Sequence, residues 1–404
     1  RYVFLYCFLI ISSYFLSLSD CVATHIRGGE ITYTQRQSLE FCFTLTLYTD
    51  STPGVATSDQ VQFFFGDGSP AIDVVVSSRV NIGNEIDIST YEICHVFPAP
   101  GSYDIHVIEE NRDAGIVNFD NGNSVGAAFA ARTNILINAS LDLNNSPIFL
   151  DSPIFFAPLG QTFRQNMLAF DAQGDSLAYR LTNPLQNIDE IAPYFLPEGF
   201  KINQLTGEII WDNPDRQGTY VFAVEIQKWR DGLLIGKVVR DIQINVSLED
   251  FTLEPPRLSP ASAGSGLDHP DGTRFEPGEP VSFQVITPKV FGQDITTELA
   301  AYGALIETGA AQVQMLDSSD GNGNMYHLIQ IDWTPSEQEV RASPYTITFR
   351  KSYQGLPLGY KDDFTLIFYV GADAVSNQAV IVATEESKAY ADNIRVFPNP
   401  VQSQ

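Results

Sequence analysis

Aspartates on glycine-containing turns are the residues of this 404-residue sequence whose types and spacing could do chemistry. In the stretch AFDAQGDSLAYRL, Asp171 and Asp175 lie on either side of Gln173 and Gly174. A turn of this kind could bring two carboxylates and neighbouring backbone carbonyls around one hard cation, and such oxygen ligands suit Ca²⁺. The sequence therefore offers a calcium site at Asp171 and Asp175 as its first chemical hypothesis.

A second acidic loop, DSSDGNGN, carries Asp317, Asp320 and Asn322 beside two glycines. It has the acidic spacing of a calcium loop but lacks the distal bidentate glutamate of an EF-hand. A third stretch, NFDNGNS around Asp120, holds a single carboxylate. Aspartate and asparagine also form Asx turns without any metal, and that alternative stays open at all three places.

Histidines and the common catalytic motifs give no sign of an enzyme. The five histidines are scattered, and the sequence holds no HExxH, no GxSxG and no phosphate-binding loop. His95 and His106 fall in alternating stretches, where a structural histidine is more common than a ligand. Carboxylates are plentiful, but spacing singles out no pair for acid–base work. We therefore predict a protein that is not an enzyme.

Aromatic residues beside turns are the candidates for binding a sugar, chiefly Tyr194 and Trp229. Packing in a core or between domains is the alternative for both, because large aromatic side chains are usually buried. In KWRDGLLIG, the Arg-Asp-Gly run predicts a hairpin turn with Trp229 near its end.

Two of the four cysteines can form a disulfide. Cys7 and Cys21 fall in or beside the N-terminal apolar segment, which leaves Cys42 and Cys94. An even number of cysteines suits an oxidising compartment. The sequence does not supply the Cα distance that decides the pairing, so a bridge and two free thiols both stay open.

The net charge of −26, from 49 acidic and 23 basic residues, limits the possible partners. Such a surface repels a phosphate backbone, so we expect no nucleic-acid partner. The hydrophobic fraction of 44% is enough for packed cores, and the length suggests two to four domains.

Alternating stretches must position these residues, and nearly all of them have the period of a β-strand. Examples are EFCFTLTLY, TYVFAVEI, VVRDIQINV, YTITFR and FTLIFYV, separated by turn signals such as GDGSP, DNGN and EPGEP. Patterns of an amphipathic helix are scarce. We predict an all-β protein.

A repeated tyrosine indicates the number of domains. GSYDIHV, GTYVFAV and SPYTITF each place a tyrosine after a turn, at the start of an alternating strand. Their spacing suits three immunoglobulin-like β-sandwich domains in tandem, in which a tyrosine can pin a corner with its hydroxyl. The predicted domains span residues 24–143, 144–248 and 249–370.

Both ends of the chain carry further segments. Residues 1–23 combine a basic start with an apolar run and predict a secretory signal peptide, with an uncleaved anchor as the alternative. Residues 371–392 predict a less ordered linker. Residues 393–404, NIRVFPNPVQSQ, start as a strand and lead to a Pro-rich turn formed by Phe397, Pro398, Asn399 and Pro400.

Two stretches of the first predicted domain resemble the PKD-type immunoglobulin-like fold. They are FFFGDGSP and HVFPAPGSYDIHV. In that family a strand ends in a Gly-Asp-Gly turn, and a His-x-Phe or His-x-Tyr segment leads to a later strand. Phe65 stands where a tryptophan is common, so we expect different packing there.

The second predicted domain resembles the cadherin-like, putative-Ig modules of bacterial surface proteins. The resemblance lies in AFDAQGDSLAYRL and PEGFKINQLTGEIIWDNPDRQGTYVFAVEI and extends over most of residues 147–246. In those modules, aspartates matching Asp171 and Asp175 can bind Ca²⁺, which implies the same cofactor here. Gln173 replaces an acidic residue often found between them.

Taken in order, ATHIRGGEITY, FGDG, ENRDAGIVN, NNSPIF and KWRDGLLIGKVVRDIQINV resemble a group of large Bacteroidetes cell-surface proteins. Those proteins are exported by the type IX secretion system and often carry a gliding-motility-associated or sorting C-terminus, whose start the Pro-Asn-Pro turn resembles. The resemblance implies a non-enzymatic protein of the outer cell surface that serves adhesion or gliding.

The implied partners are the type IX secretion machinery and a polysaccharide or another cell-surface ligand. A carbohydrate-binding accessory module of a surface polysaccharide-utilisation system is the alternative function.

Overall fold

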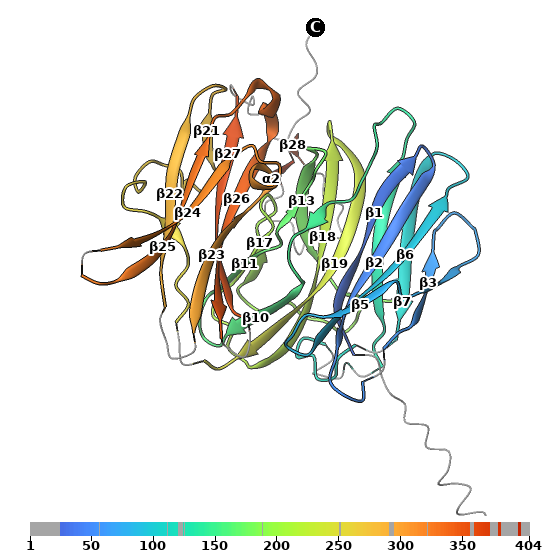
Figure 1. Ribbon diagram of the computed structural model, residues 1–404. Helices are drawn as coiled ribbons and strands as arrows, with labels where there is room; N and C mark the ends of the chain where they lie inside the picture. The colour runs from blue at the N-terminus through green and yellow to red at the C-terminus, as the bar shows by residue number, and fades with distance from the viewer. Residues whose placement is uncertain are drawn as a thin grey trace, which may run out of the picture.

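The computed structural model divides the chain into three β-sheet units that lie side by side (Figure 1). It describes residues 25–371, apart from positions 56, 111, 120–123, 125, 188, 250–251, 291–294, 321 and 356–358. Beyond them it describes the backbone of β28 (Ala379–Val380) and β29 (Arg395–Val396), which pair with each other. The predicted signal peptide, most of the linker, Asp120 and the Phe397–Pro400 motif lie outside the described residues.

Strands make up most of the described chain. Helical structure within the described ranges is limited to α2 (Ala304–Glu307) and the 3₁₀ turn η2 (Glu337–Glu339). The prediction of an all-β fold built from β-sandwich units is confirmed.

The first unit is coloured blue to cyan-green in Figure 1. Along β2, Phe41, Phe43, Leu45 and Leu47 are fully buried and form the core, whereas Cys42 and the threonines between them face the other way. This is the two-residue period that the sequence shows. Its strands are β1 (Ile26–Gln37), β2 (Glu40–Asp50), β3 (Gln60–Phe64), β4 (Ile72–Val75), β5 (Ser78–Asn81), β6 (Ile86–Val96), β7 (Gly101–Glu109) and β8 (Phe129–Ile137).

The second unit has Trp211 at the centre of its core. Its indole packs edge-on against Tyr220, with ring centroids 4.8 Å apart, and against Phe200 at 5.7 Å. Its strands are β9 (Ile148–Phe149), β10 (Ile154–Pro158), β11 (Phe163–Asn166), β12 (Ala169–Phe170), β13 (Ser176–Thr182), β14 (Leu185–Gln186), β15 (Asp189–Glu190), β16 (Phe200–Ile202), β17 (Glu208–Trp211), β18 (Gly218–Arg230) and β19 (Leu233–Ser247).

The third unit is a sandwich of two four-stranded sheets. One has the order β20-β22-β25-β24 and the other β21-β27-β26-β23. Phe283, Trp333, Phe349 and Phe368 pack between the sheets. Its strands are β20 (Arg257–Leu258), β21 (Thr273–Phe275), β22 (Val281–Pro288), β23 (Thr296–Tyr302), β24 (Gln312–Ser319), β25 (Met325–Trp333), β26 (Arg341–Gln354) and β27 (Lys361–Val370).

The repeated tyrosine holds the same kind of corner in each unit. Each phenol O–H donates a hydrogen bond to a backbone carbonyl four to six residues earlier. A tyrosine corner of this kind fixes the approach to a late strand of an immunoglobulin-like sandwich. The bonds run from Tyr103 to Ala99 (2.8 Å), from Tyr220 to Arg216 (3.1 Å) and from Tyr345 to Glu339 (3.0 Å).

Strand β19 belongs to two units at once. It forms a long hairpin with β18, and on its other side its first half pairs with β8 and, through Asp241, with Gly29 of β1. Its second half pairs in parallel with β10. The predicted domains 24–143 and 144–248 are therefore joined through one continuous sheet, because β19 is long enough to serve both.

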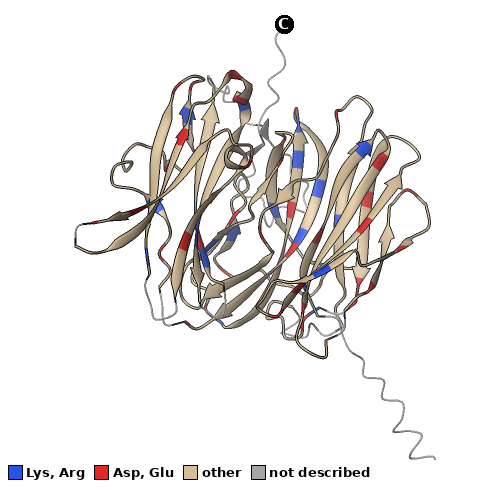
Figure 2. Cartoon of the chain, in the orientation of Figure 1, with Lys and Arg blue, Asp and Glu red and all other residues tan. Residues whose placement is uncertain are grey.

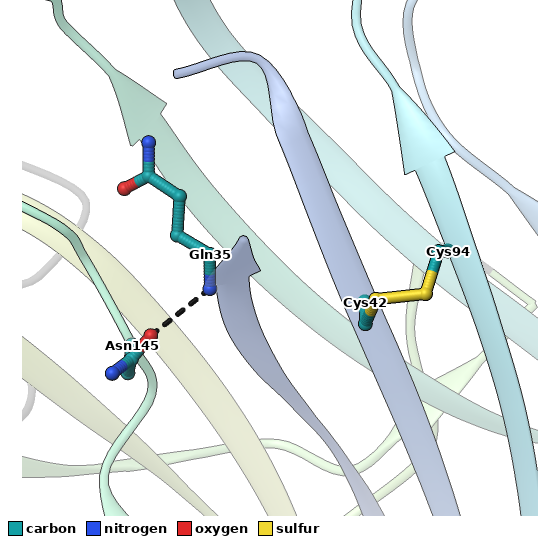
Figure 3. The surroundings of a disulfide bond; sticks show 4 residues. All are labelled: Gln35, Cys42, Cys94 and Asn145. Atoms are coloured by element: carbon teal, nitrogen blue, oxygen red, sulfur yellow. Dashed lines mark hydrogen bonds between the residues drawn. A yellow bond between two sulfur atoms is a disulfide. The ribbon is translucent and has the colours of Figure 1, made fainter. Parts of the chain in front are cut away.

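Cys42 and Cys94 are joined by a disulfide (Figure 3). They are directly opposite each other in the β2–β6 register, and their Cα atoms are 3.9 Å apart. The register thus provides the distance that the sequence left open. On the neighbouring strand β1, the backbone N–H of Gln35 donates to the side-chain oxygen of Asn145, 2.9 Å away, which ties the first unit to the start of the second (Figure 3).

Candidate functional site

The turn at Asp171 and Asp175 is held together by a buried lysine. Asp171 accepts hydrogen bonds from the backbone N–H groups of Gln173 (2.9 Å) and Asp175 (3.0 Å), which makes it an Asx turn. The Lys228 ammonium on β18 lies 2.9 Å from a carboxylate oxygen of Asp171 and 2.9 Å from one of Asp175. Lys228 is fully buried. The chain's own ammonium thus lies between the two carboxylates.

Arg230, also on β18, completes this cluster. Its guanidinium contacts both carboxylate oxygens of Asp175, at 2.8 and 2.7 Å. Burial acts to raise the pKa of Asp175, but the bonds and charges of Arg230 and Lys228 outweigh it and lower the pKa. A calcium ion at this turn would have to displace the Lys228 ammonium. The geometry gives the two aspartates a different cation from the predicted one, and calcium there stays a prediction.

The sequence contained a signal for this pairing that the turn motif alone did not reveal. Lys228 and Arg230 are two residues apart in a strand, so their side chains lie on the same face. Strand β18 pairs directly with β13, which begins immediately after Asp175. Two cations facing the end of an acidic turn could have been inferred if the pairing of β13 with β18 had been known.

The second acidic stretch covers the end of β24 and the loop to β25, and its acidic groups have separate partners. Asp317 lies 2.6 Å from the Lys289 ammonium, whereas Asp320 accepts hydrogen bonds from the backbone of Asn322 (2.8 Å) and Asn324 (3.2 Å). Within the described ranges, no group of three metal-ligating side chains is close enough to hold an ion. The loop has the geometry of an Asx turn, and calcium at this loop also stays a prediction.

The two aromatic candidates are engaged within the molecule. Tyr194 is half-buried, donates from its hydroxyl to the carbonyl of Val221 (3.3 Å) and packs edge-on against Phe119 of the first unit. Trp229 is also half-buried, and its indole N–H donates to Gln227 at 3.3 Å. Tyr194 therefore contributes to packing between units. A ligand role for either residue stays a prediction.

His95 has a structural environment. Its imidazole stacks on Phe65 with ring centroids 3.9 Å apart, and its Nε2 lies 2.7 Å from Asp67 of the Gly-Asp-Gly turn. Asp67 also accepts hydrogen bonds from Ser69. The histidine pins the turn to the core, and Phe65 supplies the stacking surface at the position where the resembling family commonly has tryptophan.

A buried ion pair lies where the first two units meet. The Arg112 guanidinium contacts both carboxylate oxygens of Asp241, at 2.9 and 2.7 Å, and both residues are almost completely buried. Arg112 also donates to the carbonyl of Leu185 at 3.1 Å and lies over the rings of Phe119 and Phe129. The bidentate geometry and the additional acceptors offset part of the cost of removing both charges from water, and burial still raises the pKa of Asp241.

A second buried pair lies on the opposite face of β19. Arg240 is adjacent to Asp241, so its side chain points the other way and contacts Glu30 of β1 at 3.1 Å. The Arg240 guanidinium also donates to the carbonyl of Asp151 and lies 4.3 Å from the centre of the Phe149 ring. The Arg-Asp dipeptide of β19 thus supplies one charge to each side of the shared sheet.

Two glycines permit this close contact between β1 and its neighbours. A Cβ atom on Gly28 would lie 2.6 Å from the carbonyl oxygen of Asp241, and one on Gly29 would lie 2.5 Å from that of Thr46. Both distances are far below van der Waals contact. The Arg-Gly-Gly-Glu motif of β1 and the Arg-Asp motif of β19 therefore form the junction between the units. Sequence reasoning assigned them no role.

The third unit is attached to the second by another buried charge cluster. Arg350 contacts Asp363 at 2.6 Å within the third unit and also donates to Asp151 of the second unit. The same carboxylate oxygen of Asp363 accepts a hydrogen bond from the backbone N–H of Asn166, 2.7 Å away, and the Lys361 ammonium contacts Asp151. Figure 2 shows this concentration of charged residues between the units.

Burial raises the pKa of two acidic side chains near that cluster. Burial, with the Asp363 charge beside it, raises the pKa of Asp362 to about 8. The same causes raise the pKa of Glu208 to about 7. The junction of the second and third units therefore responds to pH near neutrality.

A cleft of about 390 Å³ lies over the outer face of β1 and β2, and we call it the threonine cleft. The hydroxyls of Thr34, Thr44 and Thr46 on its floor make no hydrogen bond to another described residue. Asn145 and Gln173 form part of the opposite wall. A second cleft of about 440 Å³ lies where all three units meet and shares Tyr48 and Phe149 with the first.

No family model and no curated protein matches the chain. Among solved structures, it is similar to a complex of Dpr2 Ig1-Ig2 with DIP-Theta Ig1-Ig3, at 12% identity and a TM-score of 0.21, with 56% of this chain and 99% of that chain covered. The N-terminal four Ig domains of Dscam1 isoform 7.44 are 11% identical, with 81% and 69% covered and a TM-score of 0.19.

Cadherin-like domains 1 to 4 of zebrafish RET are also 11% identical, with 78% and 69% covered and a TM-score of 0.18. Scores this low carry no argument about function or about the arrangement of the units. In the part of the chain that the structure describes, no helix has the length and apolar character needed to span a membrane.

Proposed function

We propose that this protein is a non-enzymatic protein of the cell exterior, whose immunoglobulin-like units act as one stiff body in adhesion or surface attachment. The observation that carries the proposal is the junction of the first two units, where β19 continues one sheet into the other. The Arg112–Asp241 and Arg240–Glu30 pairs lie buried at that junction. A body joined in this way transmits force and holds a binding surface in a fixed orientation.

An exterior location is supported by the Cys42–Cys94 disulfide, because such bonds persist in oxidising compartments. Export through the type IX route, with the sorting turn at Phe397–Pro400 as its address, belongs to the same proposal. It rests on the sequence resemblance. Fractionation of cells that produce the protein, followed by surface proteolysis, tests the location: protection of the protein in intact cells would contradict it.

The proposed adhesive role is tested with the full chain coupled to beads. We would count attachment to intact cells and to a panel of polysaccharides, each with calcium and with a chelator, and measure released reducing ends in the same wells. Saturable attachment without product release is the expected result. Product release would identify an enzyme and overturn the proposal, and absence of attachment to every surface would remove the adhesive role.

Glycan binding in the threonine cleft is the second candidate function. Hydroxyls and side-chain amides, together with acidic groups already paired with Arg240 and Lys228, suit a neutral sugar. Replacing Thr44 by Val keeps the shape and removes one hydroxyl, so attachment to a neutral polysaccharide should weaken. Thr273→Val, in the third unit, is the control. Equal attachment by both variants would remove the cleft as the site.

A further inference from the structure

Strand β24 is an open sheet edge. It is the outermost strand of the sheet β20-β22-β25-β24, and no other described strand pairs with its free side. The β24–β25 hairpin extends beyond the body of the third unit (Figure 1). Seven of the eight residues of β24 are exposed. The outward N–H and C=O groups of such a strand can accept another strand by continuing the sheet.

The inner face of β24 is apolar and uncovered at Val313 and Met315. Val313 pairs with Ile331 and Met315 with Ile329, so each pair lies on one face of the sheet. Ile329 and Ile331 are 1% and 0% exposed and belong to the core, but Met315 is 66% exposed. The opposite sheet ends at β23. An added strand would continue this face and shield Met315.

The edge is also uncharged from Gln312 to Leu316. Several other terminal strands carry one charge each, namely Asp73 on β4, Arg79 on β5, Arg257 on β20, Arg274 on β21 and Glu298 on β23. Charged edges discourage pairing between molecules. The single charge of β24, Asp317, is paired with Lys289 at 2.6 Å. Figure 2 shows this hairpin mostly without charged residues.

We propose that β24 pairs with β24 of a second copy of this chain, in an antiparallel arrangement about a two-fold axis. A molecule with a net charge of −26 repels its own copies, so a copy can approach most easily at a locally neutral edge. Residues directly opposite each other in an antiparallel pair have their side chains on the same face of the sheet. A two-fold axis between two copies of β24 must therefore pass through a residue position, and not between two residues. At Gln314, it places Val313 opposite Met315 of the second copy.

This register buries the apolar part of the inner face of β24 in both copies. Val313 and Met315 of both copies then form one continuous cluster, and the two Gln314 side chains lie opposite each other on the outer face. An axis at Met315 instead places Val313 opposite Asp317, and an axis at Val313 leaves Met315 beyond the overlap of the two strands. The inference goes beyond the proposed function, because it does not depend on what the protein adheres to.

Sedimentation equilibrium of the full chain tests the contact. We expect a reversible dimer for the unchanged chain and for Val75→Lys, a control on the short edge strand β4 with the same 66% exposure as Met315. Met315→Lys should weaken the dimer at least about tenfold, or about 1.4 kcal/mol. A monomeric unchanged chain, or a dimer that Met315→Lys leaves intact, would overturn the proposal.

Cysteine crosslinking tests the register in a background with Cys7 and Cys21 replaced by serine. Residues paired directly across two antiparallel strands have Cα atoms about 4.5–5.5 Å apart, which a disulfide spans. Gln314→Cys should therefore form a covalent dimer on mild oxidation, whereas Gln312→Cys, opposite Leu316 of the second copy, should not. Crosslinking of Gln312→Cys alone would overturn the two-fold axis at Gln314.

Discussion

The two junctions of the molecule are built differently. The first and second units share β19 and bury two ion pairs on either side of it. The second and third units share no described strand, and side chains from separate sheets meet around Arg350, Asp363 and Asp151. A backbone ladder couples its two units at every rung, whereas the second and third units are coupled through side chains, namely these charged groups and an apolar cluster that includes Phe156 and Tyr360. We therefore expect the first two units to unfold together and the third as a separate step.

Asp241→Asn is expected to lower the stability of the first two units more than any other change described below. It leaves the buried Arg112 guanidinium without its counter-charge, which costs about 3–5 kcal/mol. In urea unfolding, the shared transition of the first two units should move to lower denaturant, and the transition of the third unit should stay.

Two variants control this prediction. Asp104→Asn removes the partner of the exposed Arg132 and should cost less than about 1 kcal/mol. The double variant Arg112→Met, Asp241→Leu should recover much of the loss, because no buried charge remains. A small effect of Asp241→Asn would show that the pair does not hold the junction.

Loss of the Cys42–Cys94 disulfide is expected to have the second largest effect on stability. Cys42 and Cys94 are 52 residues apart in sequence, and a bridge over such a loop stabilises a fold by about 2–4 kcal/mol. A Cys42→Ser, Cys94→Ser variant should therefore lower the shared transition. If the two units unfolded separately, the transition of the first unit would move to lower denaturant, and a separate transition of the second unit would stay in place.

Gly29→Ala tests the close approach of β1 and β2. The added Cβ would meet the carbonyl oxygen of Thr46 at 2.5 Å, and overpacking of this kind costs about 1–3 kcal/mol. Gly359→Ala is the control, because its nearest neighbour would be 3.8 Å away. Calorimetry that gives equal melting temperatures for the two variants would contradict the packing described here.

The pH dependence of stability should distinguish the junction of the second and third units from that of the first two. Asp362 has a pKa raised to about 8, so its favourable contribution is present in full below its unfolded pKa and is lost as pH rises towards 8. Between about pH 5 and 7, each unit of pH should lower the stability of the third unit by about 1.4 kcal/mol. Asp362→Asn should flatten the profile. An unchanged slope in that variant would assign the effect to another group, such as Glu208.

Local pattern was enough to predict the strands but not their partners. The alternation in EFCFTLTLY and the tyrosines at 103, 220 and 345 predicted the sandwich class, because period and turn chemistry are properties of neighbouring residues. The partner of Asp171 could not be predicted in the same way. Lys228 lies 57 residues further along the chain, and only the pairing of β13 with β18 places it there.

The sequence by itself determined the all-β class, the corner tyrosines and the net charge of −26. Each depends on composition or on short-range periodicity. Tertiary structure alone decided that β19 serves two units, that Arg112 meets Asp241 and that β24 is left as an open edge. These features depend on which strands become neighbours, and strand pairing is fixed by contacts between residues far apart in the chain.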